Sequence, residues 1–494
     1  MLTRREFLEV GTKAGVVASG WPWRRDWPQA GATVNDIHSQ LNPTHVHRVV
    51  RVDSHEAVRA AVRAARAERR GLSIAGGRHS MGGQQFGTGT ILLDTRPMNR
   101  ILNLDQANGV LEVEAGIQWP ELIDGYLRLQ QGRPQQWGIA QKQTGADRLS
   151  VGGALASNVH GRGLRMKPFV GDVESFRLVG ADGVVRTCSR SENAELFRLV
   201  IGGYGLFGVV YSARLRLTPR RKVERVVEVR GVDDLSAAFE QRIADGYLYG
   251  DFQFETDDTS DTFLTRGVFA CYRPVDPSTP IPPSQAALSA DDWIGLLYLA
   301  HADKAAAFRR YSQHYLSTSG QIYWTDTNQL GYYAEEYHLA LDRRLGASVP
   351  ATEMITELYV PRGDLAAFLR EAAQELRRSA APVIYGTIRL IERDDETFLP
   401  WAKDRFACIV LNLHVDHSSQ GLERSQRAFR GLIDLARGKG GSYFLTYHRW
   451  ATREQLEACY PQFREFLRLK RQYDPEGVFQ SDWYRHYEAM FGGR

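Results

Sequence analysis

Ser73-Ile74-Ala75-Gly76-Gly77-Arg78-His79-Ser80-Met81-Gly82-Gly83-Gln84 is the stretch that decides the fold. It predicts a short strand that runs into a loop with two adjacent glycines, followed by a histidine between an arginine and a serine. Glycines let backbone N–H groups approach an anionic group closely, and successive amides form an anion-binding nest. Ser80 and Gln84 can add hydrogen bonds to such a ligand. Taken alone, the stretch also fits a tight turn that carries a surface histidine.

Two further glycine-rich segments favour the ligand-binding interpretation. Residues 149–163 read LSVGGALASNVHGRG, and such small side chains allow a flat, bulky ligand to lie against the backbone. Residues 203–208 match G-x-G-x-x-G, the pattern of a dinucleotide site that follows a strand and opens a helix. Here the pattern follows an expected helix at 195–199 and precedes the β-branched pair Val209-Val210. We therefore do not expect a Rossmann NAD site.

The pattern around these segments predicts an α+β protein. Ser54 can cap a helix in which apolar residues recur at 58, 61, 62 and 65, between strands at 46–52 and 72–75. Further strands are expected at 91–94, 110–115, 174–179 and 209–217, with helices at 119–129 and 193–200. We expect domains at 40–220 and 221–455 and a C-terminal segment at 456–494. The second domain alternates longer helices (235–245, 287–299, 365–378, 422–437) with strands (353–360, 407–415).

Bulk composition excludes several classes of protein. With 494 residues, the chain is long enough for two or three domains. Lys and Arg number 62 against 58 Asp and Glu, a balance that gives no case for a nucleic-acid partner. The four cysteines lack metal-ligand spacing, so neither a disulfide framework nor a zinc site is expected. No apolar run approaches the roughly 18–20 residues of a transmembrane helix.

The N-terminus resembles a twin-arginine export signal. Arg4-Arg5 precedes Phe7-Leu8 and a stretch of mostly small residues, and Ala30-Gly31-Ala32 fits a cleavage site. We therefore assign 1–35 to a signal region outside the fold and expect a periplasmic or exported protein. The alternative is an ordinary basic tail on a cytoplasmic protein.

In order and spacing, the three glycine-rich segments resemble the FAD domain of the vanillyl-alcohol oxidase/p-cresol methylhydroxylase (PCMH) superfamily. The likeness is to alditol and aldonolactone oxidases and to cytokinin dehydrogenases. It implies an α+β fold with a two-subdomain PCMH-type FAD-binding domain, an α+β substrate (cap) domain, and a C-terminal segment that returns to the FAD domain. It also implies FAD bound covalently through His79. One branch of the superfamily forms a second bond to the flavin from the cysteine of a Cys-x-x-Val segment. That bond is not available here, because Arg148 stands at the cysteine position, three residues before Val151. The implied FAD contacts are Gly76, Gly77, Arg78, His79, Ser80, Gln84, Gly145, Ser150, Gly153, Ser157 and Val209.

The same resemblance suggests catalytic residues in the second domain. Thr387-Ile388-Arg389 is similar to a Glu-x-Arg segment of these oxidases, with Thr387 in place of the acid. Arg389 can stabilise an alkoxide or polarise a hydroxyl. Where the family has a catalytic lysine, this sequence offers Tyr447 or His448 as a base. Structural roles for all three residues stay open.

We therefore expect an FAD-linked enzyme that oxidises a CH–OH donor, such as a sugar, polyol or aldonolactone. The donor passes a hydride to flavin N5, and O2 or another acceptor reoxidises the flavin. Three alternatives stay open. One is CH–NH oxidation of the cytokinin-dehydrogenase type, for which no acidic base is evident by position. The others are a ligand-sequestering flavoprotein without turnover and an NADPH-dependent reductase of the sterol type.

Overall fold

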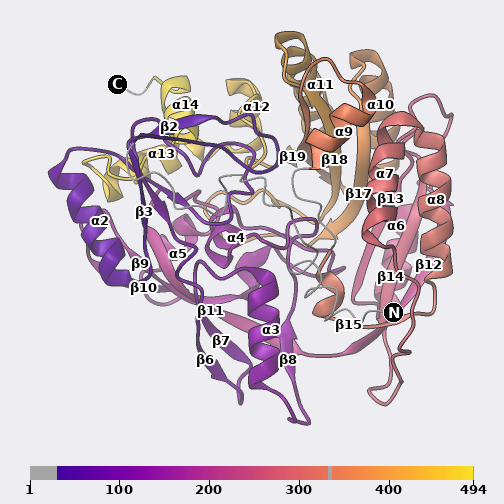
Figure 1. The fold of residues 1–494 in the computed structure, drawn as a ribbon, viewed down its shortest axis with the longest axis horizontal. Helices are drawn as coiled ribbons and strands as arrows, with labels where there is room; N and C mark the ends of the chain where they lie inside the picture. The colour runs from indigo at the N-terminus through magenta and orange to yellow at the C-terminus, as the bar shows by residue number, and fades with distance from the viewer. Residues whose placement is uncertain (1–30, 332–336, 493–494) are drawn as a thin grey trace.

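A computed structural model of the protein describes residues 31–331 and 337–492. The twin-arginine motif and the small-residue stretch after it lie outside the described residues, so export stays a prediction. The described chain forms two α+β halves, with the FAD-domain segments in indigo to magenta on one side and the cap segments in pink to orange on the other (Figure 1).

Two sheets build the first half. A parallel sheet has the order β3-β5-β4, and an antiparallel sheet has the order β10-β9-β11-β7-β6, with β8 also paired to β11. Their strands are β3 (Arg48–Arg51), β4 (Leu72–Ala75), β5 (Ile91–Asp94), β6 (Ile101–Asp105), β7 (Val110–Glu114), β8 (Trp137–Ile139), β9 (Val173–Val179), β10 (Val185–Ser189) and β11 (Val209–Pro219). The helices are α2 (His55–Ala67), α3 (Trp119–Leu129), α4 (Val151–Ser157) and α5 (Ala194–Val200).

The elements of this half confirm most of the sequence-based expectations. Ser54 caps α2, its hydroxyl accepting from the backbone N–H of Ala57, and the helix buries Val58, Ala61, Val62 and Ala65. The expected βαβ unit is present, but β5 lies between its two strands and pairs in parallel with both. Residues 203–208 connect α5 to the antiparallel strand β11, which confirms that the G-x-G-x-x-G match is not a Rossmann motif.

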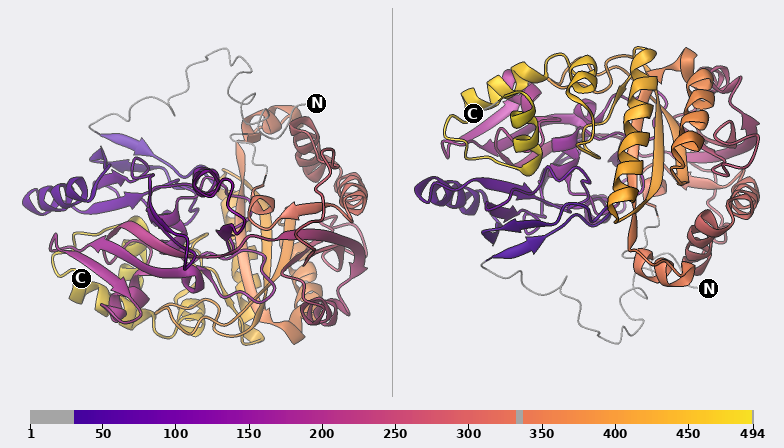
Figure 2. Two further views of the ribbon diagram at one scale, coloured as in Figure 1. Left: turned by 90° about the horizontal axis from the view of Figure 1, so that it is seen from below. Right: turned by 90° about the horizontal axis from the view of Figure 1, so that it is seen from above.

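The cap half is built on one eight-stranded antiparallel sheet of order β15-β12-β14-β13-β17-β18-β16-β19. Its strands are β12 (Lys222–Gly231), β13 (Tyr249–Phe254), β14 (Arg266–Pro274), β15 (Ile322–Trp324), β16 (Ala351–Pro361), β17 (Val383–Ile391), β18 (Phe406–Asp416) and β19 (Ser442–Tyr443). Its helices are α6 (Leu235–Ala244), α7 (Ala290–Ala302), α8 (Lys304–Ser317), α9 (Tyr337–Leu345), α10 (Leu365–Ser379) and α11 (Ser419–Gly438). Figure 2 shows helices on both sides of this sheet.

Strand alternation gives the two faces of the cap sheet different roles. Phe269 on β14 packs edge-on against Phe239 of α6, with the ring centroids 4.8 Å apart. Its neighbours Val268 and Ala270 point the other way and pack against Phe308 and two tyrosines of α8. Along a strand, side chains therefore point alternately into the apolar core and toward the face that carries α7 and α8.

The C-terminal segment closes onto the first parallel sheet. Leu72 on β4 accepts from Gln480 N–H at 2.9 Å and donates to the Val478 carbonyl at 2.6 Å. Asp474 holds this connection, because its carboxylate accepts from Lys470 Nζ at 2.6 Å and from the backbone N–H groups of Val478 and Phe479. Figure 1 shows the yellow helices α12 (Arg453–Cys459), α13 (Phe463–Tyr473) and α14 (Asp482–Met490) on the indigo side of the molecule.

The prediction that residues 1–35 lie outside the fold is wrong for residues 32–35. β1 (Ala32–Val34) pairs with β2 (Thr44–Val46), and Ala32 and Val34 pack in a core cluster with Phe86. The loop that follows is ordered by Asp36, whose carboxylate accepts from Ser39 and other nearby groups. The folded domain therefore includes residues from Ala32 onward.

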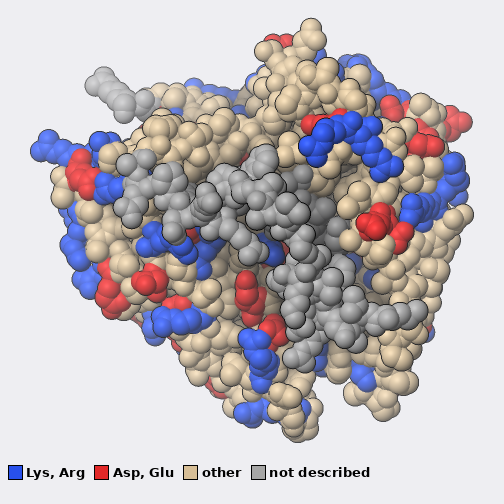
Figure 3. All heavy atoms as spheres, in the orientation of Figure 1, with Lys and Arg blue, Asp and Glu red and all other residues tan. Residues whose placement is uncertain are grey.

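Charged side chains of both signs are interspersed on the face shown in Figure 3. Within residues 31–331 and 337–492, no helix combines the length and apolar composition needed to cross a bilayer.

The Asp474–Lys470 pair should be important for stability, because both side chains are only 1% exposed. Asp474→Ala leaves a buried ammonium without its partner, a loss that costs about 3–5 kcal/mol. We expect a clear drop in the thermal unfolding midpoint. Glu476→Ala is the control, since Glu476 pairs with Arg66 at the surface and its removal should leave the midpoint nearly unchanged. Equal midpoints for the two variants would contradict this role of Asp474.

Candidate active site

The three glycine-rich segments meet around one pocket. The pocket lies where the loop after β4, the start of α4 and the loop before β11 converge. Nine of the predicted cofactor residues line it: Gly76, Gly77, Arg78, His79, Ser80, Gln84, Ser150, Gly153 and Ser157.

Two predicted cofactor residues lie elsewhere. Val209 does not line the pocket, although Gly208 and Val210 on either side of it do. Gly145 is exposed, in the loop before α4, with a φ of +82°. Contacts of all eleven residues with the cofactor stay predictions.

The pocket wall depends on glycine because backbone lies directly against backbone. A Cβ on Gly77 would stand 2.3 Å from the carbonyl oxygen of Arg148, and one on Gly76 would stand 2.1 Å from Ser150 Oγ. Arg78 adopts a left-handed φ of +60°, which turns the chain around the pocket. Because Ser150 also caps α4, accepting from Gly153 N–H, a bulkier residue 76 would disturb that helix start as well. This backbone-lined pocket fits a flat dinucleotide such as FAD.

His79 is buried at the pocket, and its Nδ1 lies 2.8 Å from Nε2 of His38. Burial, together with the nearby charge of His38, lowers the pKa of His79 well below its usual value. Burial also lowers the pKa of His38, to about 4. Both imidazoles are therefore neutral at physiological pH, and a neutral imidazole is the nucleophilic form.

A second group of side chains lies at the cap sheet, beside the pocket. Gln84 of the pocket donates through Nε2 to Thr446 Oγ1 at 2.6 Å, and Thr446 also contacts Ser157. The next residue, Tyr447, lies close enough to Glu357 on β16 for this carboxylate to raise the pKa of its hydroxyl. Two consecutive residues, Thr446 and Tyr447, therefore connect the cofactor pocket with the buried carboxylate of Glu357.

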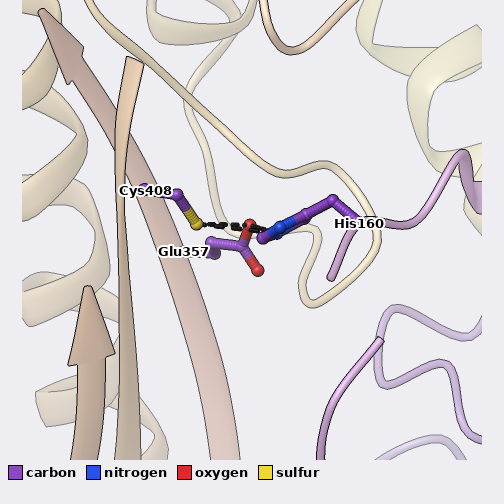
Figure 4. Close-up of side chains that lie close together, drawn as sticks. All are labelled: His160, Glu357 and Cys408. Carbon is purple, nitrogen blue, oxygen red and sulfur yellow. Dashed lines mark hydrogen bonds and ion pairs between the residues drawn. The ribbon is translucent and has the colours of Figure 1, made fainter. Parts of the chain in front are cut away.

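Donors from three segments converge on a single oxygen of Glu357, Oε1. His160 Nε2 lies 2.6 Å from it, Tyr359 OH 2.5 Å and Cys408 Sγ 3.1 Å. Figure 4 shows His160 reaching the carboxylate from the FAD-domain side and Cys408 from the sheet. His160 Nδ1 is 3.0 Å from the Gly161 carbonyl, to which it donates. A separation of 2.6 Å is too short for two bare acceptors, so His160 and Glu357 share a proton.

The charge state of the cluster follows from these contacts. Burial alone would raise the pKa of Glu357, but the charge of His160 and the converging hydrogen bonds outweigh it and lower the pKa to about 2. Burial and the neighbouring Glu357 raise the pKa of Tyr447 well above 10. Glu357 is therefore an anion, and Tyr447 remains a neutral hydroxyl that can donate but is unsuited to act as the base.

Arg389 lies on the same face of the cap sheet, because its partner in the β17–β18 register is Cys408. It is 7% exposed, and its guanidinium donates to Thr144 Oγ1 in the loop before α4. Arg389 is therefore a buried cation between the two halves and not a surface strand residue. The structure thus brings together two of the predicted catalytic residues, Arg389 and Tyr447, around Glu357.

His448 does not join them. Its ring packs 4.3 Å from Phe429 and stacks on Trp450, and its Nδ1 accepts a long 3.4 Å bond from the Trp450 N–H. Burial lowers the pKa of His448 to about 3. This placement favours a structural role in an aromatic core over the catalytic role predicted from the sequence.

Glu357, His160 and Cys408 are site residues that the sequence did not single out. The sequence shows no acidic base by position, because Thr387 on β17 stands where the family has an acid. The structure places a buried carboxylate, Glu357, on β16 of the same sheet. Polar residues in this strand come in pairs, Thr352-Glu353 and Thr356-Glu357, so nothing in the pattern marks Glu357, and only the strand order reveals its neighbours. The one signal in the sequence is His160, within the second glycine-rich segment.

The fold and this site are those of a flavin-dependent oxidoreductase with a separate cap sheet. A family model of FAD binding domains matches residues 46–189, and one of D-arabinono-1,4-lactone oxidases matches residues 345–487. The chain thus carries a PCMH-type FAD-binding domain followed by a domain of the D-arabinono-1,4-lactone oxidase type, as the resemblance predicted.

Three relatives illustrate the similarity. L-gulono-1,4-lactone dehydrogenase of Mycobacterium tuberculosis is 24% identical over 405 residues, 81% of this chain and 86% of that protein. Decaprenylphosphoryl-beta-D-ribose oxidase of Mycolicibacterium smegmatis is 22% identical over 480 residues, 94% of this chain and 97% of that protein. An uncharacterized oxidoreductase from the fasciation locus of Rhodococcoides fascians is 35% identical over 184 residues, which cover 37% of this chain and only 39% of that protein.

Gly77→Ala tests the backbone-lined pocket. A methyl group forced against the Arg148 carbonyl should cost about 1–3 kcal/mol of cofactor binding, a weakening of about tenfold or more. We expect a marked fall in visible flavin absorption per purified chain. Gly363→Ala is the matched control, because a Cβ there meets nothing within 4 Å. Full flavin content in Gly77→Ala would show that the pocket is not the cofactor site.

Proposed function

We propose that this protein oxidises the CH–OH group of a small polyhydroxylated donor, with Glu357 as the proton acceptor. The observation that carries the proposal is the buried Glu357 carboxylate, oriented through one oxygen beside the FAD pocket. Bound FAD supplies the two-electron acceptor that takes hydride from the donor carbon. The protein has to orient the donor hydroxyl, remove its proton and stabilise the charge left on oxygen.

Each of these tasks has a residue in the cluster. His160, Tyr359 and Cys408 all bond to Oε1, which fixes the plane of the carboxylate and directs Oε2 elsewhere. With its pKa lowered to about 2, Glu357 is too weak a base to deprotonate an alcohol beforehand. It therefore takes the hydroxyl proton only as the hydride leaves, when the hydroxyl becomes strongly acidic. Arg389, a permanent cation on the same face, stabilises the developing alkoxide.

The adjoining face of the sheet supports a donor with several hydroxyl groups. Phe252 and Ile388 are register partners, so Asp251 and Gln253 lie opposite Arg389 and Thr387 on the face that carries Glu357. Among the described residues, several buried polar atoms of this face have no hydrogen-bond partner. They are Asp251 Oδ1, Gln253 Oε1, Thr387 Oγ1, Arg389 Nε and Asn412 Oδ1. Groups of this kind need a polar ligand or water.

The carboxylate also keeps CH–NH oxidation open as a second candidate, because an acidic residue suits an amine donor. The row of buried donors and acceptors favours a hydroxylated donor over a flat, largely apolar amine. Anaerobic bleaching of the flavin separates the two candidates. Bleaching by polyols or aldonolactones supports CH–OH oxidation, and bleaching by adenine-type amines supports CH–NH oxidation.

We further propose that the flavin is attached covalently to His79. Support comes from the position of His79 in the pocket wall and from the neutral His38 beside it, whose Nε2 can accept a hydrogen bond from Nδ1 of His79. Such a bond increases the electron density, and so the nucleophilicity, of the other ring nitrogen. A permanent link would also retain the cofactor in an exported protein, the localisation predicted from the N-terminus.

His79→Ala should convert the flavin from acid-stable to acid-extractable. The wild-type protein should keep its yellow colour in the acid precipitate, whereas the variant should release its flavin into the supernatant. His45→Ala, at an exposed histidine of β2, serves as the control. Complete release of flavin from the wild-type protein would refute the covalent link without affecting the oxidoreductase assignment.

Glu357→Gln tests the proton acceptor. The amide keeps the shape but cannot accept the proton, so we expect the anaerobic rate of flavin reduction by donor to fall by about 10²–10⁴-fold. Flavin content should stay at the wild-type level. Glu371→Gln, which removes a half-exposed carboxylate of α10, is the control and should reduce at the normal rate. A normal rate in Glu357→Gln would exclude Glu357 as the base.

A further inference from the structure

Apart from the catalytic cluster, the cap half holds a second set of converging side chains. His301 lies at the C-terminal end of α7, and Glu353 and His414 are register partners on β16 and β18. His301 Nε2 is 3.1 Å and His414 Nδ1 3.4 Å from the same oxygen, Glu353 Oε1. The side chains are 5%, 17% and 9% exposed for His301, His414 and Glu353, respectively. Three elements thus bring two imidazoles and one carboxylate to a single buried point.

The distances suit ligands of one cation. Tetrahedral zinc with bonds of about 2.0–2.1 Å to nitrogen and oxygen places its ligand atoms about 3.3 Å apart. The separations of 3.1 and 3.4 Å bracket that value. The catalytic cluster provides the contrast: His160 and Glu357 approach to 2.6 Å, which is too close for two ligands of one zinc ion and typical of a shared proton.

The second nitrogen of His301 specifies its orientation. His301 Nδ1 lies 2.7 Å from the carbonyl of Leu297, one turn earlier in α7, and donates to it. A ring that donates only through Nδ1 turns the lone pair of Nε2 toward Glu353 Oε1, which is itself an acceptor. A cation between the two atoms satisfies both, and a backbone carbonyl behind the imidazole is the usual support of a metal-binding histidine.

The other oxygen of Glu353 is already engaged. Tyr337 at the start of α9 donates its hydroxyl to Glu353 Oε2, which leaves Oε1 as the oxygen that faces both imidazoles. Tyr337 thus orients the carboxylate in the way that hydrogen-bonded neighbours orient metal ligands in proteins.

We propose that His301, Glu353 and His414 bind one zinc-class divalent cation that fastens α7 to the cap sheet. Two imidazoles and a carboxylate form a ligand set that zinc accepts, with a fourth position for water. The ion lies on the strand that carries Glu357, four residues earlier, and joins α7 to the face that holds the substrate. Its role is structural, since it stabilises the wall of the active site and takes no part in the redox step.

Metal analysis of the purified flavoprotein tests the proposal directly. After equilibration with zinc and removal of free metal, we expect about one zinc per chain by mass spectrometry. In Glu353→Gln and His414→Ala, the zinc content per chain should be at least tenfold lower. His314→Ala, a histidine of α8 outside the cluster, is the matched control and should keep it. Zinc should raise the unfolding midpoint of the wild type and of His314→Ala but not of the two cluster variants.

The wild-type protein alone gives a second test should a variant fail to fold, as judged by its flavin content. X-ray absorption at the zinc edge should report nitrogen and oxygen neighbours with imidazole scattering and no sulfur. Any of three results would overturn the proposal: no zinc in the wild-type protein, zinc that is still bound in Glu353→Gln, or sulfur among the neighbours of the zinc ion. None of these readouts depends on turnover, so the result is independent of the proposed donor and base.

Discussion

The contact between two stretches of backbone, residues 76–77 against 148–150, is the constraint on which the site depends. Without side chains at these glycines, the loop after β4 can close on the start of α4 and leave a pocket between them. The position of His79 in the wall follows from this closure. So does the path of the following residues, because Gln84 then reaches Thr446 and places Tyr447 at Glu357.

The two halves of the chain meet at one site. The FAD half supplies the pocket and His160, while the cap sheet supplies Glu357, Cys408 and Arg389 from three adjacent strands. Arg389 contacts Thr144 across the junction, so the two halves are linked by polar groups of the site itself. The C-terminal segment then returns to β4, where Val478 and Gln480 pair with Leu72 immediately before the glycine loop.

Local features could be predicted from the sequence, and long-range ones could not. The helix after Ser54, the strand 72–75 and the glycine loops depend on neighbours within a few residues, and the structure has them where they were expected. Glu357 escaped prediction because its partners lie on β18 and after α4, about 50 and 200 positions away along the chain, and only strand register brings them together. His448 is the contrasting case: its segment is similar to the one that carries the family's catalytic lysine, while packing against Phe429 decides the environment of the side chain. The histidines around Glu353 gave no spacing signal, since each comes from a different element.

The alternation of the cap sheet has an evolutionary consequence. On β16, Met354, Thr356 and Leu358 face one side of the sheet, while Ile355 and Glu357 face the other. Changes at every second position can therefore reshape the walls around a bound donor while leaving the hydrophobic layer intact. On a sheet of this kind, single substitutions on one face can change donor preference, while the residues on the other face continue to hold the fold together.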